Sequence, residues 1–399
     1  MQYISLKKQF HISEKKSQDL YLKRFESESC QRLGIEMNGF ECFYIVNEEI
    51  LKLVTQIYSI NTWIEKTLGS KDLPYTAQNY LIMKSLIEEI KSSNKIEGIY
   101  STRKEISDIL INEEPCEYKR FYGMVNKYYK LINEQFLSID CCSDIRNLYD
   151  EILLQDIIDE DVSDIPDGIL FRKNAVEIDS GIKIIHKGVL GEKNIIEMLD
   201  KSLKILNNEN LTLLIRIAVF HYLFEYIHPF YNGNGRIGRF IATGYLSNEF
   251  HILSSFQLSI ACIHHIKKYY ESFELVNDIR NKSDLTPFII HFLEIYLSGL
   301  IELKESIYNT ITLYNHLTNQ INHCISFKHK DLINVLLEAT LFAVDGLTMS
   351  NLVKITSKTE QTLRSFIKEI NQKDHIILID HSHKPYRYKV DIDIISTLE

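Results

Sequence analysis

This chain of 399 residues has no Cys-x-x-Cys pair, no excess of basic residues and no uninterrupted apolar run long enough to span a membrane. Its seven cysteines are irregularly spaced, so we expect free thiols in a reducing cytoplasm. The net charge of −9 excludes a global basic field that would attract nucleic acid or an anionic membrane. The N-terminus shows no signal-peptide pattern, and charged residues interrupt the strongest apolar runs, 211–226 and 288–300. We therefore expect a cytoplasmic protein with no membrane partner.

Internal repeats and low-complexity tracts are also absent, and the length predicts two or three domains. The acidic segment 156–167 lacks the glycine at position six and the glutamate at position twelve of an EF-hand loop. We therefore reject a calcium site there and expect a solvated connector.

The most informative segment is 228–239, which reads His-Pro-Phe-Tyr-Asn-Gly-Asn-Gly-Arg-Ile-Gly-Arg. The run 211–226 before it predicts a buried helix, and the proline and glycines then predict a turn into a new helix. Gly233 and Gly235 permit positive φ angles and a close approach to the backbone. A Gly-Asn-Gly turn that enters a helix exposes N–H groups and therefore predicts an anion site.

Three charged or titratable side chains surround this turn. Arg236 and Arg239 are three residues apart, which places them on one side of a helix, and guanidinium groups suit phosphate oxygens. His228 lies at the mouth of the turn and titrates near neutral pH, as a general base should. A glycine turn with a core histidine and two surface arginines is the alternative, but the density of these groups favours a phosphate site.

The segment 228–239 resembles the signature of the Fic (Fido) family, His-Pro-Phe-x-Asp/Glu-Gly-Asn-Gly-Arg-x-x-Arg, and departs from it only at Asn232. The resemblance implies a mainly α fold, with a helical core and a β-hairpin flap. It also implies a protein adenylyltransferase, which moves AMP from ATP to a Tyr, Ser or Thr hydroxyl of a target protein, with His228 as the catalytic base. The ATP contacts that it implies in this segment are Asn232, Gly233, Asn234, Gly235, Arg236, Ile237, Gly238 and Arg239.

The departure at Asn232 concerns Mg²⁺, which the resemblance implies as a cofactor bound with ATP. The family usually has an acidic residue there, which holds the ion between the α- and β-phosphates. An amide oxygen can coordinate Mg²⁺ but carries no charge. We therefore expect weak metal binding at Asn232, with the phosphates supplying most of the ligands.

The segment 93–98 resembles the inhibitory helix motif of the family, Ser/Thr-x-x-x-Glu-Gly/Asn. By this resemblance Ser93 and Glu97 are inhibitory, and Glu97 pairs with Arg239, the arginine that otherwise holds the γ-phosphate. The alternative is an exposed helical glutamate followed by a glycine cap.

Two more segments extend the resemblance. Tyr269 and Asn277 match the adenine side of the family's site, where a tyrosine can stack on the base, although a pair of core aromatics is the alternative. The β-branched run 181–186 predicts one strand of a hairpin, with 175–178 as the other. In the family such a flap pairs with the target segment, and this resemblance assigns target docking to Ile184, Ile185 and His186.

The C-terminal part predicts helices at 330–340, 349–355 and 357–371 and strands at 375–380 and 386–390. This order is typical of a winged helix-turn-helix and resembles the C-terminal domain of many Fic proteins. Its charges are roughly balanced, so DNA binding stays open beside a protein-interaction or dimerisation role.

We expect an N-terminal helical region at 1–90, a Fic core at 91–305 with the inhibitory helix at 93–98, a linker helix at 306–328 and a winged helix-turn-helix at 329–399. The alternatives for function are a de-AMPylating or bifunctional enzyme, in which Glu97 positions a water, phosphocholine transfer, and a DNA-binding regulator that senses a nucleotide. A homo-oligomer also stays open, and the target protein is not identified by the sequence.

Overall fold

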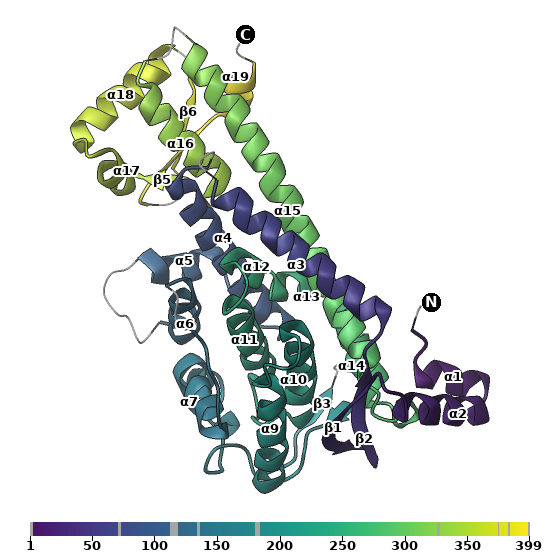
Figure 1. The fold of residues 1–399 in the computed structure, drawn as a ribbon. Coiled ribbons are helices and arrows are strands. Elements are labelled where there is room, and N and C mark those ends of the chain that lie inside the picture. Colours follow the sequence, from purple (N-terminus) through teal and green to yellow (C-terminus); the bar gives the residue numbers. More distant parts are fainter. Residues whose placement is uncertain are drawn as a thin grey trace. The chain divides into compact units, whose positions relative to one another are not determined.

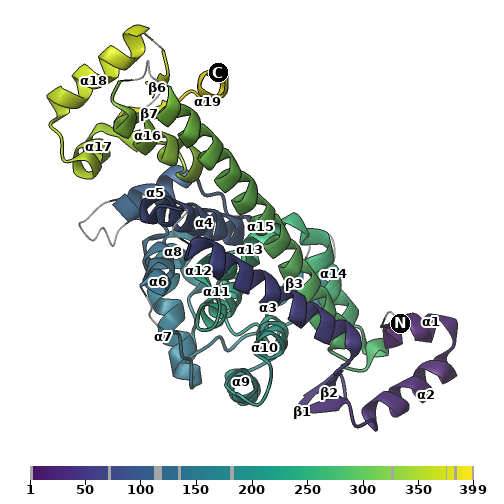
Figure 2. The ribbon, with the colours of Figure 1, turned by 45° about the horizontal axis from the view of Figure 1, so that its top comes forward.

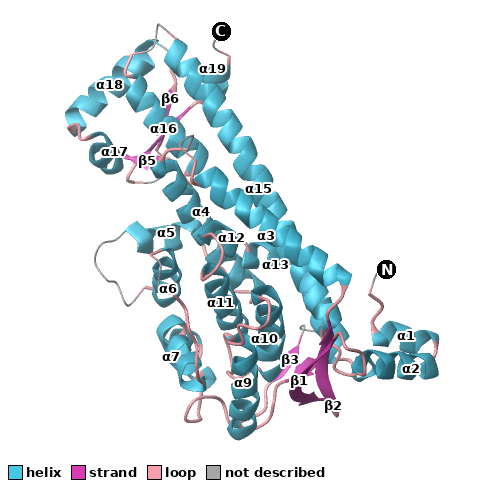
Figure 3. Cartoon of the chain, in the orientation of Figure 1, coloured by secondary structure: helices cyan, strands magenta, loops and turns pink. Residues whose placement is uncertain are grey.

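The structure is a computed structural model that describes residues 3–70, 73–111, 119–133, 136–179, 184–324, 328–373, 375–381 and 384–397. These residues are mainly helical, and their strands form three small sheets (Figure 3). The chain forms two compact units, Met1–Trp63 with Leu86–Ile301, and Ile64–Ser85 with Glu302–Glu399. Helices α3 (Glu48–Leu68), α4 (Tyr75–Ile96) and α15 (Thr286–His323) each contribute to both units. The units therefore differ from the four expected ranges.

The first unit begins with α1 (Leu6–Ile12) and α2 (Glu14–Phe25), which a β-hairpin follows (Figure 1). Strand β1 (Cys30–Met37) pairs antiparallel with β2 (Phe40–Ile45). The turn between them is Asn38-Gly39, with φ angles of 54° and 78°, as a two-residue hairpin turn requires. The region 1–90, which was expected to be helical, therefore also contains a two-stranded sheet.

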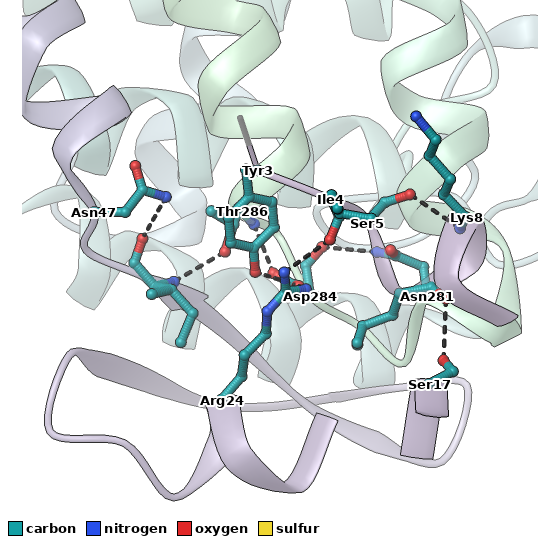
Figure 4. Close-up of polar contacts among 12 residues, drawn as sticks. Tyr3, Ile4, Ser5, Lys8, Ser17, Arg24, Asn47, Asn281, Asp284 and Thr286 are labelled. Atoms are coloured by element: carbon teal, nitrogen blue, oxygen red, sulfur yellow. Dashed lines mark hydrogen bonds and ion pairs between the residues drawn. The ribbon is translucent and has the colours of Figure 1, made fainter. Parts of the chain in front are cut away.

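The buried carboxylate of Asp284 ties this N-terminal region to the start of α15 (Figure 4). The hydroxyl of Tyr3 donates a hydrogen bond to Asp284 Oδ2 at 2.6 Å, and Arg24 Nη1 lies 3.4 Å from the same oxygen. The backbone N–H of Thr286 donates to Oδ1 at 3.0 Å. Burial raises the pKa of Asp284, and the Arg24 charge and these donors oppose that rise. Segments about 260 residues apart therefore depend on one carboxylate.

We expect Asp284→Ala to lower the free energy of unfolding by about 3 kcal/mol, because it leaves Arg24 and two hydrogen-bond donors without their partner. Urea unfolding measures this change, and Asp19→Ala on the exposed face of α2 is the matched control. A loss in Asp284→Ala no larger than in the control would contradict this role.

The core of the first unit contains three neighbouring helices, α9 (Glu192–Leu206), α10 (Leu213–Ile227) and α11 (Asn234–Ser247), which lie side by side in Figures 1 and 2. Helix α10 is buried at nearly every position because it is apolar on all faces, which confirms the buried helix expected before the motif. The other elements of this unit after α4 are α5 (Arg103–Ile111), α6 (Tyr122–Ile132), α7 (Cys142–Ile152), α8 (Leu154–Glu160), η1 (Val162–Asp164), α12 (Ile252–Ser255), α13 (Leu258–His264), α14 (Ile266–Asn277) and η2 (Ile279–Asn281).

The expected flap is present as the antiparallel pair β3 (Glu177–Asp179) and β4 (Ile184–Lys187). Glu177 lies opposite Lys187, and Ile178 lies opposite His186. Residues 180–183, where the second strand was expected to begin, lie outside the described residues.

The C-terminal part of the second unit has the element order that the sequence predicts for a winged helix-turn-helix. The order is α16 (Lys330–Phe342), β5 (Leu347–Thr348), α17 (Met349–Thr356), α18 (Glu360–Lys373), β6 (Ile377–Asp380), β7 (Arg387–Val390) and α19 (Ile392–Ser396). The three strands form an antiparallel sheet in the order β5-β7-β6.

Helix α15 is, among the described residues, the one helix long and apolar enough to cross a membrane. However, 67% of its most apolar stretch is buried inside the protein, as in the core helix of a soluble protein.

Candidate active site

A tight turn between α10 and α11 carries the motif. Helix α10 ends at His228, whose backbone is left-handed with φ 53° and ψ 64°, and Gly233 precedes α11 with φ 82°. The side chain of Asn234 bridges this turn, since its Nδ2 donates to Phe230 O at 2.8 Å and its Oδ1 accepts from Phe230 N at 2.9 Å. Both polar atoms of Asn234 are thus used by the turn, and only its backbone N–H remains for a ligand.

The imidazole of His228 has a defined protonation pattern. Its Nδ1 lies 3.3 Å from the backbone oxygen of Glu225. A carbonyl oxygen only accepts hydrogen bonds, so Nδ1 carries the proton and Nε2 holds the lone pair in the neutral ring. The side chain is 16% exposed. His228 Nε2 is therefore the nitrogen that can accept a proton from a substrate.

Arg172, which no motif in the sequence marks, holds the end of α10 in place. Its Nε donates to His228 O at 2.7 Å, and its Nη2 donates to Val189 O at 2.9 Å and Ile227 O at 3.2 Å. The residue is fully buried, and burial lowers its pKa. A cation at the C-terminal end of a helix also complements the helix dipole. Arg172 thus fixes the backbone that carries His228.

The guanidinium of Arg239 is buried and bound by the predicted inhibitory segment. Its Nη2 donates to Glu97 Oε1 and to Ser93 O, both at 2.9 Å, and its Nε donates to Ser93 Oγ at 3.1 Å. Burial alone would lower the pKa of Arg239, but the Glu97 carboxylate and its neighbours raise it on balance. The predicted pairing of Ser93 and Glu97 with Arg239 is confirmed.

The guanidinium of Arg236, one turn earlier, is fully buried, and no described residue accepts a hydrogen bond from any of its three nitrogens. Burial lowers its pKa, which the Glu97, Glu160 and Asp156 carboxylates partly counter. Buried polar groups in proteins almost always have partners. Arg236 is therefore suited to an anionic ligand.

The helix that carries Ser93 is longer than the sequence predicts, since α4 continues through Ile96 instead of ending near residue 91. Gly98, with φ 74°, then ends it, and Ile99 N donates to Asn94 O at 2.9 Å. Glu97 is thereby placed at the helix end.

A third polar residue on the same face of α4 was missed. Glu89 is fully buried, and it accepts hydrogen bonds from Ser259 N at 2.8 Å and from Thr243 Oγ1 at 3.2 Å. Burial raises its pKa to about 7, although these donors oppose the rise. Glu89, Ser93 and Glu97 are four residues apart and form one polar row.

Gly235 allows Glu97 to lie against the first turn of α11. A Cβ atom at this position would lie 2.1 Å from Glu97 Oε1 and 2.8 Å from Arg239 Nη1. The N-terminus of a helix presents unpaired N–H groups that attract anions. The carboxylate of Glu97 therefore lies where the sequence predicts a phosphate.

Comparison with known families identifies this arrangement. Residues 139–246, which contain the turn and both arginines, match the profile of the Fic/DOC family. The chain contains a Fic/DOC domain. Proteins of this family generally transfer AMP or other nucleotide-phosphate groups to proteins.

Solved Fic structures resemble this chain at low sequence identity. A Fic family protein from Desulfovibrio desulfuricans G20 has 19% identity and a TM-score of 0.53, over 87% of this chain and 97% of its own. Fic-1 of C. elegans (residues 134–508) has 16% identity and a TM-score of 0.44, over 65% of this chain and 73% of its own. A signalling protein with a Fic domain from Bacteroides thetaiotaomicron VPI-5482 has 17% identity and a TM-score of 0.44, over 65% and 96%. The first of these likenesses supports the helical Fic fold.

Two residues of the motif pack the Fic/DOC domain instead of facing the anion site. The side chain of Ile237 is fully buried, and its N–H donates to Gly233 O within the helix. A Cβ atom on Gly238 would lie 2.7 Å from Glu225 Oε1 and 3.1 Å from Phe224 Cδ1, so Gly238 permits the close contact of α11 with α10. Neither residue keeps the ATP contact that was expected of it.

The expected adenine side also differs. Tyr269 is only 3% exposed, and its hydroxyl lies 2.7 Å from His221 Nε2. A buried ring offers no free face to a base, so the structure supports the alternative of a core aromatic. Tyr270 beside it is 41% exposed and donates to Ile96 O at 3.1 Å. The side-chain oxygen of Asn277 accepts a hydrogen bond from Tyr222 at 2.7 Å.

The acidic segment before the flap is not the solvated connector that was expected. Asp164 Oδ2 accepts a hydrogen bond from Asn232 Nδ2 at 3.1 Å, and Asp167 Oδ1 accepts one from Tyr231 at 2.8 Å. Asp156 in the same segment is buried. Within the described ranges, no group of three or more His, Cys, Asp or Glu side chains could hold a metal ion.

Glu225 is a second buried carboxyl group near His228. Its Oε2 lies 4.0 Å from His228 Nδ1. Burial and the charge of Glu97 raise the pKa of Glu225 to about 8, although Arg239 opposes this. At neutral pH Glu225 is therefore mostly a neutral acid.

We expect the free energy of unfolding to fall as pH rises from about 4.5 to about 8, because folded Glu225 holds its proton more tightly than the unfolded chain does. Glu225→Gln should flatten this slope over the whole interval. Glu89→Gln should flatten it only up to about pH 7. Urea unfolding at several pH values tests both, with Glu88→Gln as the control, and an unchanged slope in Glu225→Gln would contradict the expectation.

Proposed function

We propose that the Fic/DOC domain transfers AMP from ATP to a Tyr, Ser or Thr hydroxyl of a target protein and that Glu97 inhibits this reaction. One observation carries the proposal. Two buried guanidiniums lie on successive turns of α11, and one of them is bound by Glu97 while the other has no hydrogen-bond acceptor among the described residues. This arrangement suits a polyphosphate whose outer phosphate replaces the Glu97 carboxylate.

In this proposal the N–H groups of Gly235 and its neighbours and the guanidinium of Arg236 bind the phosphates of ATP. Arg239 binds the γ-phosphate after Glu97 leaves. His228 Nε2 removes the proton from the target hydroxyl, whose oxygen attacks the α-phosphorus. The bond from this phosphorus to the oxygen that bridges to the β-phosphate breaks, and pyrophosphate leaves.

The ion pair between Glu97 and Arg239 accounts for inhibition. Both the carboxylate and a phosphate need Arg239, so ATP binds productively only in the fraction of molecules in which Glu97 has moved away. The apparent affinity for ATP falls by that fraction. Glu97 is 25% exposed, so its side chain can turn towards solvent without unfolding the core.

Mg²⁺ fits the chemistry of this site, because Asn232 presents an amide oxygen next to the carboxylate of Asp164. Asn232 would hold the ion together with phosphate oxygens. When bound, the ion would neutralise charge on the phosphates.

The flap would present the target. We assign docking to the backbone of β4, which includes Ile184, Ile185 and His186, because an extended target segment can add to a strand edge through main-chain hydrogen bonds. We place the reaction in the cytoplasm, where ATP is available and thiols such as the six described free cysteines stay reduced.

Two alternatives remain. In a de-AMPylating enzyme Glu97 would hold a water, which its partial exposure permits. The winged helix order of α16–α18 and β5–β7 favours a regulator that binds DNA and senses ATP.

Glu97→Gly should increase labelling of proteins by ATP that carries a radioactive α-phosphate, because it frees Arg239. Adding His228→Ala should lower the rate by about 10²–10⁴-fold, since the general base is lost. A cell lysate incubated with each variant and analysed by mass spectrometry identifies the modified residue.

Glu88→Gln removes a carboxylate from the same helix outside the site and should behave as the unmodified chain. DNA binding without labelling in Glu97→Gly would favour the regulator. Loss of AMP from a modified protein only when Glu97 is present would favour removal.

A further inference from the structure

Asn232 occupies the motif position at which an acidic residue is usual, and the structure places a carboxylate directly beside it. Asn232 Nδ2 donates to Asp164 Oδ2 at 3.1 Å. The two residues are 68 positions apart in the chain, so folding alone brings them together. A carboxylate requires a donor, which fixes the amide nitrogen towards Asp164 and leaves the amide oxygen of Asn232 for another partner.

We propose that Asp164 supplies the carboxylate ligand of a Mg²⁺ ion that binds with ATP, with the amide oxygen of Asn232 as its neighbour. This assignment rests on the proposed function, because the phosphates of ATP supply further ligands. Mg²⁺ typically binds through one or two carboxylates together with substrate phosphates and water, instead of an all-protein cage. The pair Asp164 and Asn232 carries one negative charge, as a single acidic residue at position 232 would.

A second observation shows that an anion belongs next to this pair. Gly233 follows Asn232, and a Cβ atom on Gly233 would lie 3.6 Å from Arg236 Nη2. That guanidinium is fully buried, and no described residue accepts a hydrogen bond from it. A phosphate bound to Arg236 would therefore lie near the Asp164–Asn232 pair, where it can share a cation with the carboxylate.

The backbone around Asp164 is held in place on both sides. Asp164 closes the short helix η1, in which its N–H donates to Asp161 O at 3.0 Å. Asp161 Oδ1 caps the same turn by accepting from Ser163 N at 2.8 Å. Three residues beyond Asp164, Asp167 accepts from Tyr231, the residue before Asn232, at 2.8 Å. The segment is thus fastened to the motif at two neighbouring points.

The test measures ATP binding by calorimetry with EDTA and with excess Mg²⁺, in the Glu97→Gly background so that Arg239 is free. The readout is the metal effect, which is the ratio of the two dissociation constants. We expect Asp164→Asn to lower this ratio about tenfold. Asp159→Asn removes the same charge from an exposed residue five positions earlier and should leave the ratio unchanged.

The exchange variant Asn232→Asp with Asp164→Asn moves the carboxylate to the other side of the pair, and we expect it to restore the metal effect. Electron paramagnetic resonance of Mn²⁺ in the presence of ATP should show the same order of binding among the variants. This second readout does not depend on enzymatic activity.

An unchanged metal effect in Asp164→Asn, while ATP still binds, would overturn the assignment and leave the proposed function intact. Loss of the metal effect without recovery in the exchange variant would also overturn it, since Asp164 would then only hold Asn232. If the background variant binds no ATP in either condition, the proposed function fails and the assignment fails with it.

Discussion

Two buried guanidiniums on successive turns of one helix need anions, and this requirement organises the site. An unpaired buried charge is strongly destabilising, so each arginine must find a partner in the fold or in solution. Arg239 finds Glu97 at the end of α4, whereas Arg236 has no acceptor among the described residues. Glu89 attaches α4 to α11 and α13 through contacts that do not involve either arginine. The inhibitory segment therefore has an attachment that would persist after Glu97 leaves Arg239.

Local spacing was enough to predict the centre of this arrangement. The turn 228–235 and the helix after it follow from proline, glycine and apolar periodicity, and the pairing of Glu97 with Arg239 follows from the family resemblance. The hairpin at 30–45 was missed although its Asn-Gly turn at 38–39 is a strong local signal. That omission was an error of interpretation and not a limit of the sequence.

The remaining residues depend on contacts that no local pattern encodes. Arg172 and Asp164 reach the motif only because the chain folds segments 56 and 68 residues away against it. Tyr269 and Tyr270 are adjacent on one helix, where successive side chains point in directions about 100° apart. Which of the two is buried is decided by packing against His221, so the sequence alone could not assign the exposed ring.

The central claim is that the Glu97 carboxylate lies where ATP places its outermost phosphate. A crystal structure of Glu97→Gly grown with ATP tests it directly. The account predicts phosphate oxygens within hydrogen-bond distance of the guanidiniums of both Arg236 and Arg239, with the α-phosphorus facing His228. Nucleotide bound elsewhere, with Arg236 still lacking an anion, would contradict it.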